Sequence, residues 1–259
     1  MCTPNDDHIL TFSCAAVFVA DILGFSRLVE QAVNPHQVQN PLLRFQLLSH
    51  QQISPNQAVH GFALSDSIIY WVDLAVPGSF EQLIQCLTYL LLQSFASQPS
   101  ILVRSGLATG PLSVSAFALG TSRYNSSVFY GRSYLEAYTL SNTQGLGVRC
   151  LLSDCAAAML RQSHLALVGE FSGQHQYLWP AEATNGASHG YAQALLDNIG
   201  QMQPQPMGNA LTNLADSLAF LLGFTDDHTA AQTVRDWARR NGISHEPLET
   251  AIAQVLGRG

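Results

Sequence analysis

Two stretches decide how this chain folds: AAVFVADILGFS at residues 15–26 and LSDSIIYW at residues 64–71. Each is a short apolar run rich in β-branched and aromatic residues, which is typical of a buried strand. Each also carries an aspartate at one end, Asp21 in the first and Asp66 in the second. An aspartate beside a buried strand is costly unless its charge is neutralised, and a divalent cation is the usual solution. The pair therefore suggests a two-carboxylate metal site for phosphoryl chemistry on neighbouring strands.

The composition indicates a well-cored protein that carries few charges. Of 259 residues, 47% are hydrophobic and 11% are charged, and the length suits one large domain or one domain with an appendage. The net charge is −7 and every basic residue is an arginine, so general binding to nucleic acid or to an anionic membrane is disfavoured. An anionic substrate must be held locally, by a few arginines, by backbone amides or by a metal.

The cysteines and the first residues favour a reducing cytoplasm. Five cysteines show no zinc-ligand spacing, and their odd number argues against a disulfide framework. Residues 1–8 are polar and acidic, without the basic flank and apolar core of a signal peptide. The longest apolar run, 87–92, is too short to span a bilayer. We expect a cytoplasmic protein with no membrane partner.

Periodicity and turn signals predict an α+β fold: a ferredoxin-like, antiparallel-rich sheet with covering helices, followed by a C-terminal helical extension. Asp66 lies at the tip of a predicted hairpin, and Gly110-Pro111 is expected to turn one strand into the next. Strands are predicted over 13–20, 59–65, 67–73, 101–109, 112–117 and 148–152, with a closing hairpin in 165–179. Helices are predicted over 24–33, 41–51, 80–95, 131–140, 154–162, 191–199, 209–222, 228–241 and 246–256.

Four motifs in order resemble the class III nucleotidyl cyclase catalytic domain, the adenylate and guanylate cyclase family. FVADILGFS at 18–26 is similar to F-A-D-I-x-G-F-[ST], and Ser65-Asp66 stands where the family has Gly-Asp. VRSGLATGP at 103–111 is similar to V-R-I-G-I-x-T-G-P. FYG at 129–131, followed by a helix, resembles the W-G-x-x-V-N-x-A-x-R region. Each motif alone is weak, but the four together are specific.

The resemblance divides the chain into four parts. Residues 1–11 are expected to be an N-terminal tail, 12–180 the cyclase catalytic domain, 181–208 a linker with a short helix, and 209–259 a C-terminal helical segment. The resemblance further implies a homodimer with active sites at the interface between subunits.

Within the family, the chain more closely resembles divergent bacterial pyrimidine cyclases of antiphage systems. Those enzymes often read D-I-L-G-F, then F-S-D-S-I, then G-x-x-x-x-x-A-Y-x-L, similar to residues 21–25, 64–68 and 131–140 here. They make cyclic UMP or cyclic CMP, which activates a companion effector. The resemblance therefore implies a cyclase that favours UTP over CTP, and a partner effector reached through the product.

The family pattern assigns a metal site to the two aspartates. Asp21 and Asp66 would bind two Mg²⁺ or Mn²⁺ ions, with the Ile22 carbonyl as a backbone ligand. Both carboxylates are expected to serve the metal and not packing. The alternatives are that Asp21 caps a helix start and that Asp66 is an ordinary turn residue.

Phosphate contacts are assigned to two places. Backbone amides at a helix N-terminus would hold phosphates, and these belong to Leu23, Gly24, Phe25 and Ser26. Arg104 stands where the family has a phosphate-contacting arginine; its alternative is a structural salt bridge to an aspartate or glutamate.

The chain departs from the family at the helix that completes the site. The places of the family's ribose-binding Asn and phosphate-binding Arg hold Leu135 and Thr139, and the γ-phosphate lysine is missing. Arg132 is a candidate replacement for the lost arginine, or else a solvated surface residue. These losses favour an alternative function, a catalytically degenerate module that binds nucleotide or a partner.

Base selection is assigned to Phe62 and Val128, which stand where the family has an adenine-selecting Lys and its partner Asp. Neither side chain can read adenine in the family's way. Phe62 is expected to stack on a base or to be ordinary core, and a purine cyclase with unorthodox base recognition stays open as a further alternative.

Overall fold

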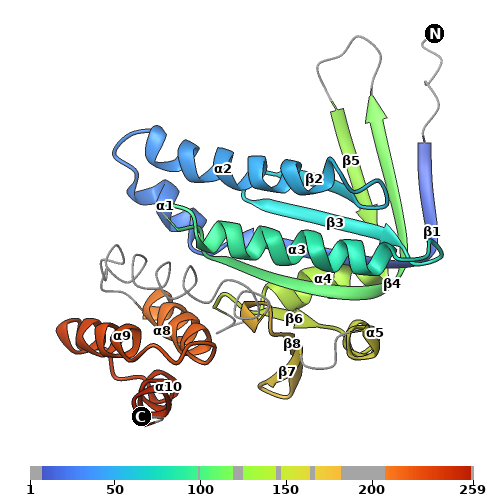
Figure 1. Cartoon of the computed structure of the whole chain (residues 1–259). Helices are drawn as coiled ribbons and strands as arrows, with labels where there is room; N and C mark the ends of the chain where they lie inside the picture. Colours follow the sequence, from blue (N-terminus) through green and yellow to red (C-terminus); the bar gives the residue numbers. More distant parts are fainter. Residues whose placement is uncertain are drawn as a thin grey trace.

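The computed structural model describes residues 8–98, 100–118, 125–143, 147–163, 167–181 and 208–257 (Figure 1). Its framework is one eight-stranded sheet with the order β2-β3-β1-β4-β6-β8-β7, in which β5 pairs with β4. All pairings are antiparallel except the parallel one between β4 and β6. The predicted α+β class and antiparallel-rich sheet are confirmed.

The elements follow the predicted order, except that the two strands predicted over 101–109 and 112–117 form the single strand β4, and that β5 was not predicted. The strands are β1 His8–Ile22, β2 His60–Leu64, β3 Ser67–Asp73, β4 Val103–Ala118, β5 Asn125–Tyr130, β6 Cys150–Leu152, β7 Val168–Phe171 and β8 Gln174–Tyr177. The helices are α1 Phe25–Gln31, α2 His36–Ile53, α3 Ser79–Phe95, α4 Arg132–Ser141, α5 Asp154–Ser163, α8 Gly208–Leu222, α9 His228–Arg240 and α10 Glu246–Leu256.

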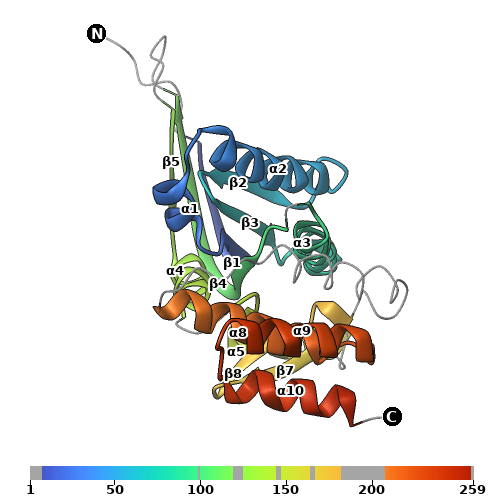
Figure 2. The ribbon, with the colours of Figure 1, turned by 90° about the vertical axis from the view of Figure 1, so that its left-hand side faces the viewer.

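Strand β1 is buried on both faces because helices cover both sides of the sheet. Its alternate residues Ala16, Phe18 and Ala20 face the core under α2 and α3, whereas Val17 and Val19 face the core under α4. The two helix layers lie on opposite sides of the strands in Figure 2. A continuous apolar run is what a strand buried on both faces requires.

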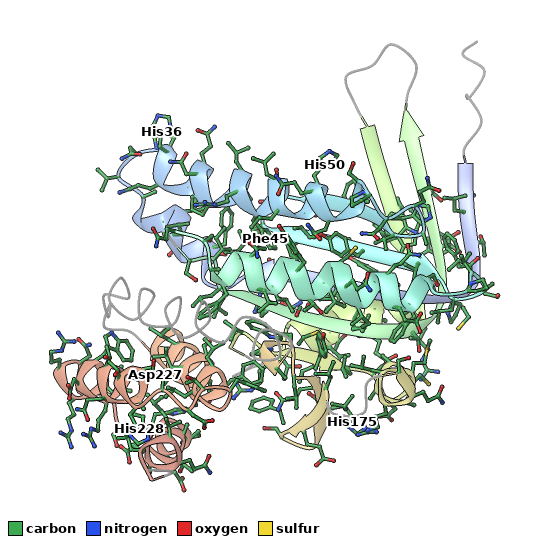
Figure 3. All side chains as sticks on the ribbon, viewed as in Figure 1. His36, Phe45, His50, His175, Asp227 and His228 are labelled. Atoms are coloured by element: carbon green, nitrogen blue, oxygen red, sulfur yellow. The ribbon has the colours of Figure 1, made fainter. Side chains whose placement is uncertain are left out.

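A buried ring and hydrogen bonds to the β2–β3 hairpin anchor helix α2 on the sheet. Phe45 is fully buried beneath α2 (Figure 3), and the Tyr70 hydroxyl of β3 donates to Ser49 Oγ on α2 at 2.9 Å. The helix begins at His36 and contains Pro41, where the sequence predicted a start at 41. A proline this near the N-terminus removes only one intrahelical hydrogen bond, and the buried face outweighs that loss.

Gly110-Pro111 does not turn the chain, as the sequence predicted, but lies within the single strand β4. Gly110 has φ 154°, and the register with β1 shifts between Phe12 and Ala15. Two β1 residues therefore stand opposite Pro111, which is a β-bulge. A bulge tolerates the missing proline N–H. Beyond it, β4, β5 and the first part of β1 project past the helices as an arm (Figure 1).

Because of that arm, β1 begins at His8, inside the predicted tail of residues 1–11. The predicted helix over 191–199 lies outside the described residues. Among the described residues, no helix is both long and apolar enough to cross a membrane.

The C-terminal helices pack on one another and join the core of the sheet (Figure 1). Phe220 on α8 lies 6.1 Å, between ring centroids, from Trp179, which follows β8. Asp227 begins α9 by accepting the amides of Thr229 at 2.8 Å and Ala230 at 3.2 Å (Figure 3). The C-terminal segment thus shares one apolar core with the sheet.

Candidate active site

Asp21 lies at the end of β1, between two strands that supply its partners. The register places it opposite Ser67 on β3 and opposite Arg104 on β4. The Ser67 hydroxyl donates to Asp21 Oδ1 at 3.0 Å. Arg104 donates from Nη2 at 2.6 Å and from Nε at 3.0 Å, both to Oδ2. Directly opposed residues of antiparallel strands share a sheet face, so sheet pairing itself builds this cluster.

Asp66 is brought to the same place by the turn between β2 and β3. The Ile22 amide donates to the Asp66 carbonyl at 3.1 Å, which sets the Ile22 backbone beside this turn. Ser65 adopts a left-handed φ of 54°, and Gln46 Nε2 of α2 donates to its carbonyl at 2.9 Å. The hairpin tip is therefore tied both to β1 and to α2.

The two carboxylates interact electrostatically. Burial raises the pKa of Asp66, and the negative charge of Asp21 raises it further. A backbone hydrogen bond and one from Ser65 oppose this shift. Two carboxylates that repel one another at the end of adjacent strands form a site that a cation would stabilise.

The donors at this point fit a magnesium-type ion. The described residues contain no cluster of three or more His, Cys, Asp or Glu side chains, so Asp21 and Asp66 are the anionic ligands offered here. Mg²⁺ is typically held by one or two carboxylates, with waters and substrate phosphates completing its shell. The Ile22 amide donates to the Asp66 backbone carbonyl, and the Ile22 carbonyl as a metal ligand stays a prediction.

The turn after Asp21 offers fewer free amides than expected. The Leu23 amide already donates to the Leu102 carbonyl at 2.8 Å, so phosphate binding by this amide, which stays a prediction, would have to replace that bond. Gly24 has a left-handed φ of 79° and precedes α1, which is only seven residues long. Phosphate binding by the amides of Gly24, Phe25 and Ser26 stays a prediction.

Solved structures share this architecture. The chain is similar to the monomeric guanylyl cyclase domain of the RhoGC fusion protein from the aquatic fungus Blastocladiella emersonii, with a TM-score of 0.52 and 15% identity over 65% of this chain and 96% of that one. The fold is that of a class III nucleotide cyclase domain. The non-canonical dimeric form of the RhoGC domain gives 0.51 and 15% identity over 64% and 95%.

The adenylyl cyclase CyaB from P. aeruginosa gives a TM-score of 0.49 and 14% identity over 65% of this chain and 93% of that one. Comparison of the sequence with protein-family models and with curated proteins finds no match. At 15% identity, the likeness to the two RhoGC structures shows the fold alone.

Phe62, assigned to base recognition, packs against aromatic rings of its own chain. Its ring centroid lies 5.4 Å from that of Phe129 on β5. Phe129 also contacts Trp71 at 5.4 Å and Tyr134 of α4 at 5.8 Å. Val128 neighbours Phe129 on the strand, is 44% exposed, and projects from the other face. Within this one chain, Phe62 and Val128 do not meet.

Helix α4 of the cyclase fold presents little to a triphosphate. Arg132 is exposed, and the described part of the chain offers it no hydrogen bond or ion pair. Leu135 is 65% exposed, and the Thr139 hydroxyl donates back to the Leu135 carbonyl at 2.8 Å. The structure does not bring these three residues to Asp21 of the same chain.

Sequence reasoning missed Ser67, Gln46 and the aromatic group around Phe129. Ser67 directly follows Asp66 at the start of the predicted strand 67–73, and this position could have marked it as a neighbour of Asp21 on the adjacent strand. Gln46 carried no signal, because its contact with the Ser65 carbonyl depends on how α2 crosses the hairpin.

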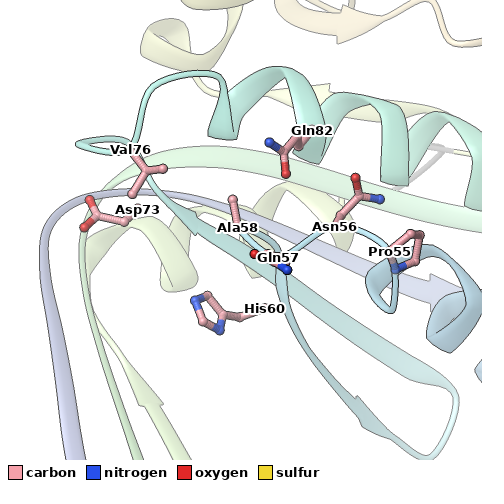
Figure 4. A pocket seen from close by; sticks show the side chains of 8 residues that line it. All are labelled: Pro55, Asn56, Gln57, Ala58, His60, Asp73, Val76 and Gln82. Atoms are coloured by element: carbon pink, nitrogen blue, oxygen red, sulfur yellow. The ribbon is translucent and has the colours of Figure 1, made fainter.

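A cavity of about 630 Å³ lies at the other end of β3, away from the carboxylates (Figure 4). Its lining mixes polar and apolar residues: Pro55, Asn56, Gln57, Ala58, His60, Asp73, Val76 and Gln82. Strand β3 runs from Ser67 at the carboxylates to Asp73 at this cavity, so the cavity is separate from the candidate active site.

Proposed function

We propose that this chain is a nucleotide cyclase that converts a pyrimidine nucleoside triphosphate, UTP ahead of CTP, to its 3′,5′-cyclic monophosphate and pyrophosphate. The observation that carries the proposal is the convergence of Asp21 and Asp66 at the end of paired strands in a cyclase fold. Cyclisation must deprotonate the ribose 3′-hydroxyl, aim it at the α-phosphorus and stabilise the leaving pyrophosphate.

The residues of this chain would divide these tasks. When bound, two divalent ions lower the pKa of the attacking hydroxyl and neutralise the triphosphate. Asp21, Asp66 and the Ile22 carbonyl would hold them, while Ser67 orients the Asp21 carboxylate. Arg104 lies in contact with Asp21 and supplies a guanidinium suited to phosphate oxygens.

The pyrimidine preference rests on the absence of a polar pair at the base-reading positions. Phe62 and Val128 offer no hydrogen bond to the adenine edge, and a half-buried Phe62 ring leaves a face on which a base could stack. The expected homodimer would place Val128 of a second copy near that ring. The antiphage role and the effector rest on the sequence resemblance.

Two other functions have specific support. Leu135 is apolar and exposed, and the Thr139 hydroxyl donates to the Leu135 carbonyl of its own helix. Neither residue offers a free polar group that could stabilise the transition state, which favours a degenerate nucleotide-binding module. The packing of Phe62 against Phe129 weakens the base-stacking argument and leaves a purine cyclase as a candidate.

The deciding experiment offers the purified chain each of the four NTPs with Mn²⁺ and separates the products by chromatography. Cyclic UMP or cyclic CMP from the wild type, and none from Asp66→Asn, supports the proposal. Cyclic AMP or cyclic GMP as the main product favours the purine cyclase. A chain that binds NTPs without any cyclic product favours the degenerate module.

A further inference from the structure

One carboxylate of the candidate metal site is already occupied by a cation of the chain itself. Arg104 donates two hydrogen bonds to Asp21 Oδ2, and the Ser67 hydroxyl donates one to Asp21 Oδ1. Asp66, by contrast, pairs with no cationic side chain among the described residues. The charge of the site is thus balanced unevenly between its two carboxylates.

We propose that Arg104 is an internal competitor for the metal: it holds Asp21 in the metal-free chain, and a divalent ion must displace its guanidinium. This inference rests on the metal site of the proposed function. It gives Arg104 two successive partners, first the Asp21 carboxylate and then, once displaced, an anionic substrate.

Electrostatics supports the competition. A guanidinium in direct contact with Oδ2 and a divalent ion on the same carboxylate would repel each other at short range. The side chains of Arg104 and Asp21 are 30% and 16% exposed, so solvent can receive the displaced guanidinium. A partly exposed ion pair is also weak enough to be exchanged.

The exchange would couple metal and triphosphate binding. The Nε–Nη2 edge of the guanidinium can donate two parallel hydrogen bonds to phosphate oxygens only once it has left Asp21. Each ligand would then favour the same displaced position of Arg104, and the two would bind cooperatively. Without nucleotide, a divalent ion would therefore bind this site more weakly than it would bind the same two carboxylates in the absence of the Arg104 guanidinium.

The test measures Mn²⁺ binding to the full chain without nucleotide, by calorimetry or by the electron paramagnetic resonance signal of free Mn²⁺. We expect Arg104→Gln to bind Mn²⁺ about fivefold or more tightly than the wild type, the usual scale of coupling between sites. Arg104→Lys keeps the charge and should bind nearly as weakly as the wild type. Arg161→Gln, on α5, is the matched control and should change nothing.

Unchanged or weaker Mn²⁺ binding by Arg104→Gln would overturn the inference, as would the lack of Mn²⁺ binding by every variant. If Arg104→Gln does not fold, the wild type decides: the Arg104 Nε–H resonance should shift as Mg²⁺ is added, and a resonance that stays in place at saturation overturns the inference. Tighter binding by Arg104→Gln in a chain that makes no cyclic nucleotide would keep this inference while removing the proposed function.

Discussion

Asp21 and Asp66 have the same chemistry but unequal surroundings. Asp21 receives hydrogen bonds from Ser67 and from Arg104, so its charge is compensated without a metal. Asp66 is half-buried beside the charge of Asp21, and its pKa is raised. The sequence predicted that both carboxylates serve the metal and not packing; the structure shows that Asp21 also serves the folded chain.

Asp66→Asn should therefore stabilise the metal-free protein. A carboxyl whose pKa is raised above 3.8 on folding binds more protons in the folded state, so its contribution to stability falls as pH rises through the raised pKa. We expect the melting temperature at pH 7 to rise by about 1–2 °C, and the gain to vanish toward pH 4. Thermal melts across this pH range, without and with Mn²⁺, provide the measurement.

Asp21→Ala is the matched contrast, because it leaves Arg104 and Ser67 without their shared acceptor. Its melting temperature should fall, whereas both variants should lose stabilisation by Mn²⁺. Equal shifts of the same sign in the two variants would contradict the asymmetry of the site.

The role of Phe62 can be tested by a substitution that keeps its packing against Phe129 but removes any stacking on the substrate base. Phe62→Leu keeps apolar volume against Phe129 but removes the aromatic face. We expect it to raise KM for UTP more than it lowers kcat, since stacking binds ground and transition states alike. The melting temperature should stay close to that of the wild type, while Phe62→Ala should lower it. An unaltered KM in Phe62→Leu would identify Phe62 as core.

Helix α4 is held on β4 by a close approach that only glycine permits. A Cβ at Gly106 would lie 2.3 Å from the Ala137 carbonyl and 2.8 Å from Leu140 Cβ. This contact buries one face of α4 and leaves Leu135 and Tyr138 exposed on the other, at 65% and 50%. The expected homodimer would cover this apolar surface of α4.

Leu135→Arg should therefore disrupt the expected homodimer. Light scattering should give twice the chain mass of 28.1 kDa for the wild type and the chain mass for the variant. Leu47→Arg is the matched control, because Leu47 on α2 is similarly exposed, at 59%. A wild type that scatters as one chain across a concentration series would remove the shared active site.

At the scale of the whole molecule, a buried charge joins the C-terminal helices to the sheet. The guanidinium of Arg149, just before β6, lies 4.1 Å from the ring centroid of Phe171 and 5.2 Å from that of Phe220 on α8. Burial lowers the pKa of Arg149 to about 10, and the charge of Asp216 opposes this shift. Asp216 Oδ1 also lies 3.0 Å from His245 Nε2, before α10.

Asp216→Asn should accordingly destabilise the whole chain, because it removes the anion that faces a buried arginine. The loss of this charge beside a buried arginine and His245 should cost about 1–3 kcal/mol. Urea unfolding followed by tryptophan fluorescence reports on both parts, since Trp179 follows β8 and Trp237 lies in α9. Asp236→Asn on the exposed face of α9 is the control. A loss confined to α8–α10 would show that they fold separately.

Local patterns in the sequence determined most of the secondary structure. The apolar run before Asp21 became the central part of β1, Asp66 lies at its predicted hairpin tip, and the predicted helix over 246–256 has these bounds in α10. Such features depend on periodicity, turn residues and caps, which act between near neighbours in the chain.

Only the tertiary structure decided what those elements place together. The ion pair of Asp21 with Arg104 joins strands far apart in the sequence, and it exists because β1 and β4 pair in one register. The same register places a bulge opposite Pro111, so that β4 continues where a turn was predicted. Phe62 meets Phe129 because both face the α4 side of the sheet. Which strands become neighbours in the sheet depends on contacts between residues far apart in the chain, and periodicity within one strand does not specify its partner.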